Sequence, residues 1–233
     1  MIDIGTTDFY IGVPSMPRHE FDGYSTQLFD EWEKFIGTTL ALPDYRLALE
    51  VEEGSVKGAG KIAVGLYALY MGIGNYGSFI SGIQTISTQV SSVGDFLANR
   101  PTAPFESRGV APKIRKNGES LSRLQRLFVK VQRGEITVEQ AMQESEVLFA
   151  GEASTCPEFM KKLQESFAQA PRFPQQIALP LETLEQGTLL PSGSKKRQPR
   201  PNLPKPAPLS QQFRVEVWRE SKKGKRNVRI IKL

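Results

Sequence analysis

The chain has one cysteine and one histidine among its 233 residues, and this scarcity excludes much familiar chemistry. A lone cysteine, Cys156, cannot form an intrachain disulfide, which fits a reducing compartment. Any Ser-His-Asp or Cys-His catalytic apparatus would have to use His19, which lies beside Pro17 in an expected loop. A zinc site made of Cys and His needs more such ligands than the chain contains. We therefore expect no enzyme, no catalytic or metal-binding residue, no cofactor and no small-molecule substrate.

Two further signatures are missing. A phosphate-binding loop needs Gly, four residues, then Gly-Lys-Ser/Thr. Around Gly58-Ala59-Gly60-Lys61, the first glycine position holds Ser55 and the hydroxyl position holds Ile62, so nucleotide binding is not expected. The first residues also lack the basic start and the long apolar run of a secretory signal. We expect residence in the cytoplasm, where the chain is free, peripheral to a membrane or inserted in one.

Charge is absent from Ile62 to Gly94, a stretch of 33 residues. Its first part, Ile62–Ile73, contains only apolar residues, Gly and Tyr, but a membrane span takes about 20 apolar residues. Three interpretations stay open for the whole stretch: a buried helical hairpin of a soluble domain, a membrane-contacting segment, or a helix oligomer.

The second part of the uncharged stretch has the apolar spacing of a helix that packs on another helix. From Phe79 to Leu97 the apolar residues recur at intervals of 4, 3, 4, 3 and 4, the period of a left-handed helix pair. The other faces carry neutral Ser, Thr and Gln, and small residues four apart favour close helix approach. The predicted helix-packing or membrane-contacting residues are Gly74, Ser78, Phe79, Gly82, Ile83, Ile86, Val90, Val93 and Leu97.

Charge of opposite sign gathers at the two ends of the chain. Residues 1–60 hold eleven acids and four bases, whereas residues 195–233 hold thirteen bases and two acids. A basic tail with aromatic residues suits nucleic acid, anionic lipid head groups, or docking on the acidic N-terminal segment. The residues predicted to bind an anionic partner are Lys195, Lys196, Arg197, Arg200, Trp218, Lys222, Lys223, Lys225, Arg226 and Arg229.

The remaining patterns predict a mainly α fold with small β elements (α+β). Its parts are a central uncharged helical pair, a small three-helix module and a C-terminal basic β-hairpin. Nine of the sixteen prolines fall in 171–210, which indicates a linker. The predicted division is an N-terminal α+β segment (1–60), the uncharged pair (61–100), the helical module (101–170), the linker (171–210) and the hairpin tail (211–233).

These features favour a non-enzymatic protein that associates with membranes or with copies of itself. A pore-forming or membrane-perturbing effector that uses residues 62–97 is the most specific form of that prediction. The alternative is a soluble nucleic-acid-binding accessory or adaptor subunit that uses the basic tail. The expected partners are the chain itself or another helical protein, together with a membrane or a nucleic acid held by the tail.

Overall fold

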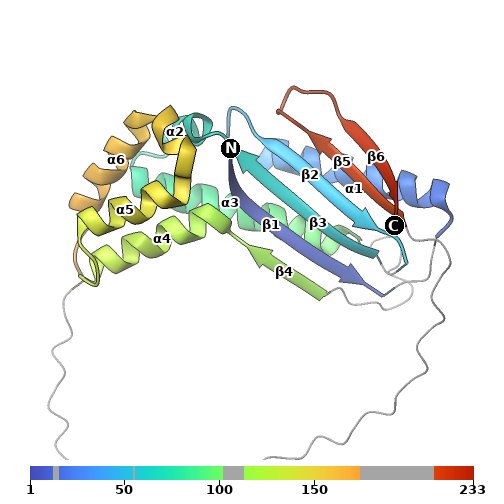
Figure 1. Cartoon of the computed structure of the whole chain (residues 1–233), viewed down its shortest axis with the longest axis horizontal. Coiled ribbons are helices and arrows are strands. Elements are labelled where there is room, and N and C mark those ends of the chain that lie inside the picture. The colour runs from blue at the N-terminus through green and yellow to red at the C-terminus, as the bar shows by residue number, and fades with distance from the viewer. Residues whose placement is uncertain (13–15, 55, 102–112, 174–212) are drawn as a thin grey trace, which may run out of the picture.

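The chain folds around a six-stranded antiparallel sheet (Figure 1). The structure is a computed structural model, and it describes residues 1–12, 16–54, 56–101, 113–173 and 213–233. The sheet order is β4-β1-β3-β2-β5-β6. The strands are β1 (Ile2–Ile11), β2 (Arg46–Glu52), β3 (Val56–Val64), β4 (Lys113–Asn117), β5 (Phe213–Arg219) and β6 (Asn227–Lys232).

The prediction of a mainly α fold with small β elements is wrong, because the sheet is the central element of the structure. The uncharged helical pair was expected to start at residue 61, but residues 61–64 belong to β3, which pairs with strands on both sides. The C-terminal residues do form a hairpin, β5–β6. It is not a separate appendage, because β5 pairs with β2 and extends the sheet.

Aromatic rings explain how the glycine-rich segment becomes a strand. A Cβ placed on Gly58 would lie 2.1 Å from the ring of Phe9, its partner on β1. A Cβ on Gly60 would lie 3.2 Å from the indole of Trp32. The two rings therefore occupy the space above strand positions that have no side chain, as aromatic residues do over glycines in other sheets. This compensation depends on residues far away in the sequence.

Two helices, α1 (Arg18–Thr39) and α3 (Phe79–Asn99), lie along one face of the sheet (Figure 1). Both are amphipathic and direct their apolar side toward the strands. Trp32 of α1 and Ile86 of α3 are 1% and 0% exposed. The stacked rings of Phe35 and Phe96, with centroids 4.4 Å apart, join the two helices. The opposite face of the sheet carries no helix in the described part of the chain.

The other helices gather at one end of the sheet (Figure 1). They are α2 (Leu66–Ile73), α4 (Glu119–Gln132), α5 (Val138–Phe149), the 3-10 helix η2 (Ala150–Thr155) and α6 (Pro157–Ala168). Phe79, at the start of α3, packs on Phe159 of α6, and Phe128 packs on Phe167. Buried residues of these helices and of the sheet form one contiguous core. The five-segment division of the chain stays a prediction.

Candidate ligand-binding cavity

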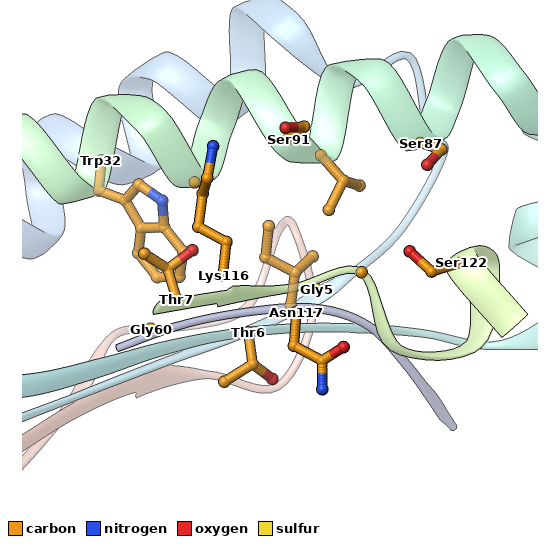
Figure 2. Close-up of a pocket in the computed structure, with 14 residues that line it drawn as sticks. Gly5, Thr6, Thr7, Trp32, Gly60, Ser87, Ser91, Lys116, Asn117 and Ser122 are labelled. Carbon is orange, nitrogen blue, oxygen red and sulfur yellow. The ribbon is translucent and has the colours of Figure 1, made fainter. Parts of the chain in front are cut away.

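A cavity of about 250 Å³ lies between α3 and the strands beneath it. Strands β1, β3 and β4 form its floor, α3 forms its roof, and α1 and the start of α4 close its sides (Figure 2). The lining residues are Gly5, Thr6, Thr7, Trp32, Gly60, Ile62, Ser87, Val90, Ser91, Gly94, Lys116, Asn117, Gly118 and Ser122.

Glycines and serines at the helix–sheet contact shape this cavity. A Cβ on Gly5 would lie 2.4 Å from Val90, and one on Gly60 would lie 2.2 Å from Leu97. Helix α3 therefore approaches β1 and β3 too closely for larger residues at these two positions. Beside these contacts α3 presents only the small side chains of Ser87 and Ser91, one helical turn apart. The space between the close contacts stays unfilled because none of these residues reaches across it.

Trp32 supplies the most informative group in the lining. Its side chain is almost fully buried, yet its indole Nε1–H has no hydrogen-bond partner among the described residues. Figure 2 shows the indole nitrogen on the edge of the ring turned toward the Lys116 and Thr7 side chains. A buried donor without a partner costs about 1–3 kcal/mol, so buried N–H groups normally have an acceptor. Since Lys116 and Thr7 both line the cavity, this N–H is directed toward that space.

The other polar groups come from three different elements. Ser87 and Ser91 of α3 and Ser122 of α4 direct their hydroxyls around the cavity, whereas the Lys116 ammonium group points toward α3 (Figure 2). There Lys116 forms an ion pair with Asp95, with nitrogen and oxygen 2.5 Å apart. The Lys116 side chain is 37% exposed in this pair, which places it at the solvent side of the cavity.

Two polar lining residues do not direct their side chains into the cavity. Thr6 and Asn117 are paired across β1 and β4 and lie on the helix-free face of the sheet. Figure 2 shows both side chains pointing away from α3. The side-chain groups that face the cavity are therefore one indole donor, one ammonium group, several hydroxyls, and the apolar surface of Ile62 and Val90.

This arrangement is rich in hydrogen-bond donors and has no carboxylate. An indole N–H and an ammonium group can only donate, while hydroxyls donate or accept. The complementary ligand is therefore a small molecule with several acceptor oxygens. The described residues contain no cluster of three or more His, Cys, Asp or Glu side chains that could hold a metal ion.

The structure places the predicted apolar spacing of α3 inside the protein's own core. Phe79, Ile83, Ile86, Val90, Val93 and Leu97 are all buried, at 8% exposure or less. They face β1, α1 and the helical end rather than solvent. A second chain or a lipid could contact these six side chains only if α3 left the sheet.

The three predicted small residues have different roles. A Cβ on Gly82 would lie 2.7 Å from the carbonyl oxygen of Ile73, so this glycine allows α3 to approach α2 closely. Gly74 is the C-terminal cap of α2. Ser78 is the N-terminal cap of α3, where it forms a capping box with Ser81. Only Gly82 lies at a helix–helix contact, and that contact is within the chain.

Several cations of the predicted basic tail contact the acidic N-terminal segment. Arg226 lies 2.5 Å from Asp30, and the Lys222 ammonium group donates to the carbonyl of Leu42 at 3.2 Å. Arg219, which was not among the predicted residues, lies 2.8 Å from Glu33. Burial raises the pKa of Glu33 although this ion pair opposes the shift. The hairpin is therefore attached to α1 by charge as well as to β2 by backbone pairing.

The remaining predicted tail residues fall into three groups. Lys223, Lys225 and Arg229 make no ion pair within the part of the chain that the structure describes. Trp218 is half-buried on the helix-free sheet face, opposite Ala48 of β2. Lys195, Lys196, Arg197 and Arg200 lie outside the described residues. Nucleic-acid binding by these residues stays a prediction.

Only part of the cavity lining could be recognised from the sequence. The neutral polar residues of α3 were noted, and two of them, Ser87 and Ser91, line it. The spacing of Leu28, Trp32, Phe35 and Ile36 predicts that Trp32 lies on the apolar side of a helix. That its N–H has no partner depends on which residues lie opposite. Lys116 belongs to β4, an edge strand whose residues are all exposed, so no apolar alternation revealed that strand.

No described helix combines the length and the apolar character required to cross a membrane. Comparison with known proteins adds no identity to this geometry. No protein-family model, no curated protein and no solved structure matches the chain.

Proposed function

We propose that this protein is a non-enzymatic binding protein whose cavity beneath α3 takes a small, oxygen-rich molecule. The observation that carries the proposal is the unpartnered indole N–H of Trp32, buried against a cavity that has hydroxyls, a lysine and no carboxylate. This ligand departs from the sequence-based expectation of no small-molecule substrate. It is proposed as a bound molecule, not as a reactant.

Size and charge narrow the ligand class. The cavity volume of about 250 Å³ lies below the range of about 300–1,000 Å³ typical of drug-sized ligand pockets. Lys116 supplies an ammonium group at the solvent side, where Asp95 partly neutralises it, and Ile62 and Val90 supply apolar surface inside. A small carboxylate, sulfonate or phosphate ester with a short apolar part suits these three features.

Thermal unfolding with a panel of small acids and their neutral amide or alcohol isosteres tests the proposal. Ligand at 100 times its Kd stabilises a protein by about 2.7 kcal/mol, which gives a measurable rise in Tm. Trp218→Phe leaves Trp32 as the single tryptophan, so its fluorescence reports binding directly. We expect at least one acid to raise the Tm and to change Trp32 fluorescence with the same Kd.

Adjacent serines on α3 provide a matched control. Both serines are exposed, but only Ser91 lines the cavity. Ser91→Leu places a larger side chain there, whereas Ser92→Leu does not. The first variant should lose the ligand-induced Tm rise and the second should keep it. Lys116→Gln should weaken the binding of acids more than the binding of their neutral isosteres. The proposal is wrong if no compound distinguishes Ser91→Leu from wild type, which is the outcome of a cavity filled with water.

The sequence-based prediction of membrane association or self-assembly remains a second candidate, and one observation favours it. On the uncharged helix α2, Tyr67 and Met71 are 64% and 49% exposed and lie one turn apart. These two side chains, rather than the buried residues of α3, are the available apolar surface of the uncharged stretch.

Liposome flotation tests this second candidate. Wild type should float with neutral and anionic vesicles, or should have a dimeric mass by light scattering. The double change Tyr67→Lys and Met71→Lys should abolish either behaviour, while Thr88→Lys on an exposed polar position of α3 should not. A wild-type chain that stays monomeric and unbound rules the candidate out.

A further inference from the structure

A groove lies between α4 and α5, on residues that do not line the cavity. Its volume is about 640 Å³. The lining residues are Arg123, Arg126, Leu127 and Lys130 of α4 and Gln143, Glu144, Val147 and Leu148 of α5. The α4 residues of the groove run from Arg123 to Lys130. These two residues are seven apart in the sequence, so the groove extends for about 10 Å, or two helical turns.

The groove has an apolar centre. Leu127 is almost fully buried at its base, and Leu148 is half-buried against the same core. Val147 is 81% exposed, the most exposed large hydrophobic side chain among the described residues. The core-facing side of α5 consists of Ala141, Ser145 and Phe149, so Val147 contributes little to the packing of its own helix. Its apolar surface is available to another molecule.

The charge around this apolar centre is mostly positive. Lys130 crosses the groove to Glu144 at 3.6 Å, which partly neutralises both groups. Arg123 and Arg126 are exposed and form no ion pair with any residue in the described ranges. Two free guanidinium groups beside an apolar groove are complementary to a segment that carries both carboxylates and apolar side chains.

We propose that the α4–α5 groove binds an acidic amphipathic helix of another protein. A helix laid in the groove would place apolar side chains at i, i+3 or i+4, and i+7 against Leu127, Leu148 and Val147. Its carboxylates would face Arg123 and Arg126, which bind carboxylates through paired N–H donors. The surface is independent of the cavity ligand, so either proposal can fail without the other.

A designed 14-residue peptide tests the surface with the full chain. The fluorescein-labelled probe carries Leu at three positions of a helical face and Glu around them, and fluorescence anisotropy measures its binding. We expect saturable binding that weakens with salt, about tenfold weaker binding to Arg126→Glu, and a similar loss with Val147→Asp. A peptide with Lys in place of Glu should not bind.

Controls on the same helix separate the groove from general charge and from folding. Val129→Asp changes an exposed valine of α4, and Arg133→Glu changes the exposed arginine at the C-terminal cap of that helix. Neither residue lines the groove, and both variants should bind the peptide as wild type does. Val147→Asp should keep the wild-type Tm because the side chain is exposed.

Four results would overturn the proposal. The first is absence of peptide binding, and the second is binding to Arg126→Glu and Val147→Asp that is as tight as binding to wild type. The third is equal binding of the Lys peptide. The fourth is a dimeric wild-type mass that becomes monomeric with Val147→Asp, since a second copy of this chain would then occupy the groove.

Discussion

At the scale of single residues, the glycines of the sheet decide how closely α3 can approach the strands. Gly60 faces Leu97 and Trp32, so an added methyl group meets packed side chains on both sides. Gly23 of α1 has nothing within 4 Å of the position of a Cβ. These two glycines therefore predict opposite effects of the same substitution.

Gly60→Ala should destabilise the protein by about 1–3 kcal/mol, because overpacking forces neighbouring side chains out of place. Gly23→Ala should be neutral or stabilising by up to about 1 kcal/mol, since alanine favours helix and meets no obstacle. Urea unfolding followed by circular dichroism measures both. Equal effects of the two changes would mean that α3 does not approach β3 as described.

Glu31 gives a pH-dependent prediction at the same scale. The hydrogen bond from Arg100 lowers the pKa of this carboxyl, and the pair links α1 to the end of α3. A lowered folded-state pKa means that the contribution to stability is present above the ordinary carboxyl pKa and is lost as pH falls through the lowered value. Glu31→Gln should therefore reduce the unfolding free energy at pH 7, by no more than about 1 kcal/mol for a partly exposed pair.

The difference between wild type and Glu31→Gln should narrow as pH falls below about 4.5, and should also shrink in high salt. Chemical unfolding at a series of pH values measures it. Glu20→Gln, on an exposed carboxyl of the same helix, is the control. A difference that grows toward low pH would contradict the sign of the pKa shift.

At the scale of elements, α3 is a core helix with one polar margin. Its buried residues attach it to the sheet and to the helical end, and Ser87 and Ser91 on its margin face the cavity. The absence of charge from the part of this helix that precedes Asp95 thus has a local consequence. A lysine or glutamate at either serine would fill the cavity or bring a second charge into it.

Ile86→Asp should prevent cooperative folding, because Ile86 is 0% exposed and a buried unpaired carboxylate costs far more than a typical core contact contributes. Thr88→Asp, on an exposed position of the same helix, should fold normally. Near-ultraviolet circular dichroism and thermal melting separate the two. An Ile86→Asp protein that folds and loses only self-association would show instead that this side of α3 is an interface.

At the scale of the whole molecule, the C-terminal hairpin completes the sheet. Phe213, Val215 and Val217 are buried, and the ring of Phe213 packs edge-on against Phe21 of α1 at 5.3 Å. Burial of three such side chains contributes about 5–9 kcal/mol, which is comparable with the whole stability of a typical domain. The hairpin is therefore part of the folding unit.

Truncation before residue 213 should give a chain that aggregates or melts without cooperativity, because it exposes the edge of β2 and removes part of the core. The full chain with Lys223→Glu and Lys225→Glu keeps the hairpin and removes two cations, and it should retain the wild-type Tm. Size-exclusion chromatography and thermal melting make the comparison. A truncated chain with an unchanged Tm would show that the hairpin is an appendage.

The sequence alone determined the features that depend on local spacing. It placed a helix from Phe79, an apolar helix side that includes Trp32, and a C-terminal hairpin. It did not show that β5 would pair with β2 across more than 160 positions, or that Phe9 and Trp32 would cover the glycines of β3. Strand pairing and ring placement join residues with no periodic relation in the chain, so no local pattern records them.

The tertiary structure alone decided what the uncharged stretch does. The missing charge and the regular spacing were visible in the sequence, but they are compatible with a core, a membrane and an oligomer. The six apolar residues of α3 are buried because the sheet supplies an apolar surface of matching size. The cavity exists because Gly5, Gly60 and two serines meet there without filling the space. Both outcomes depend on which surfaces face one another, and only the folded chain specifies that.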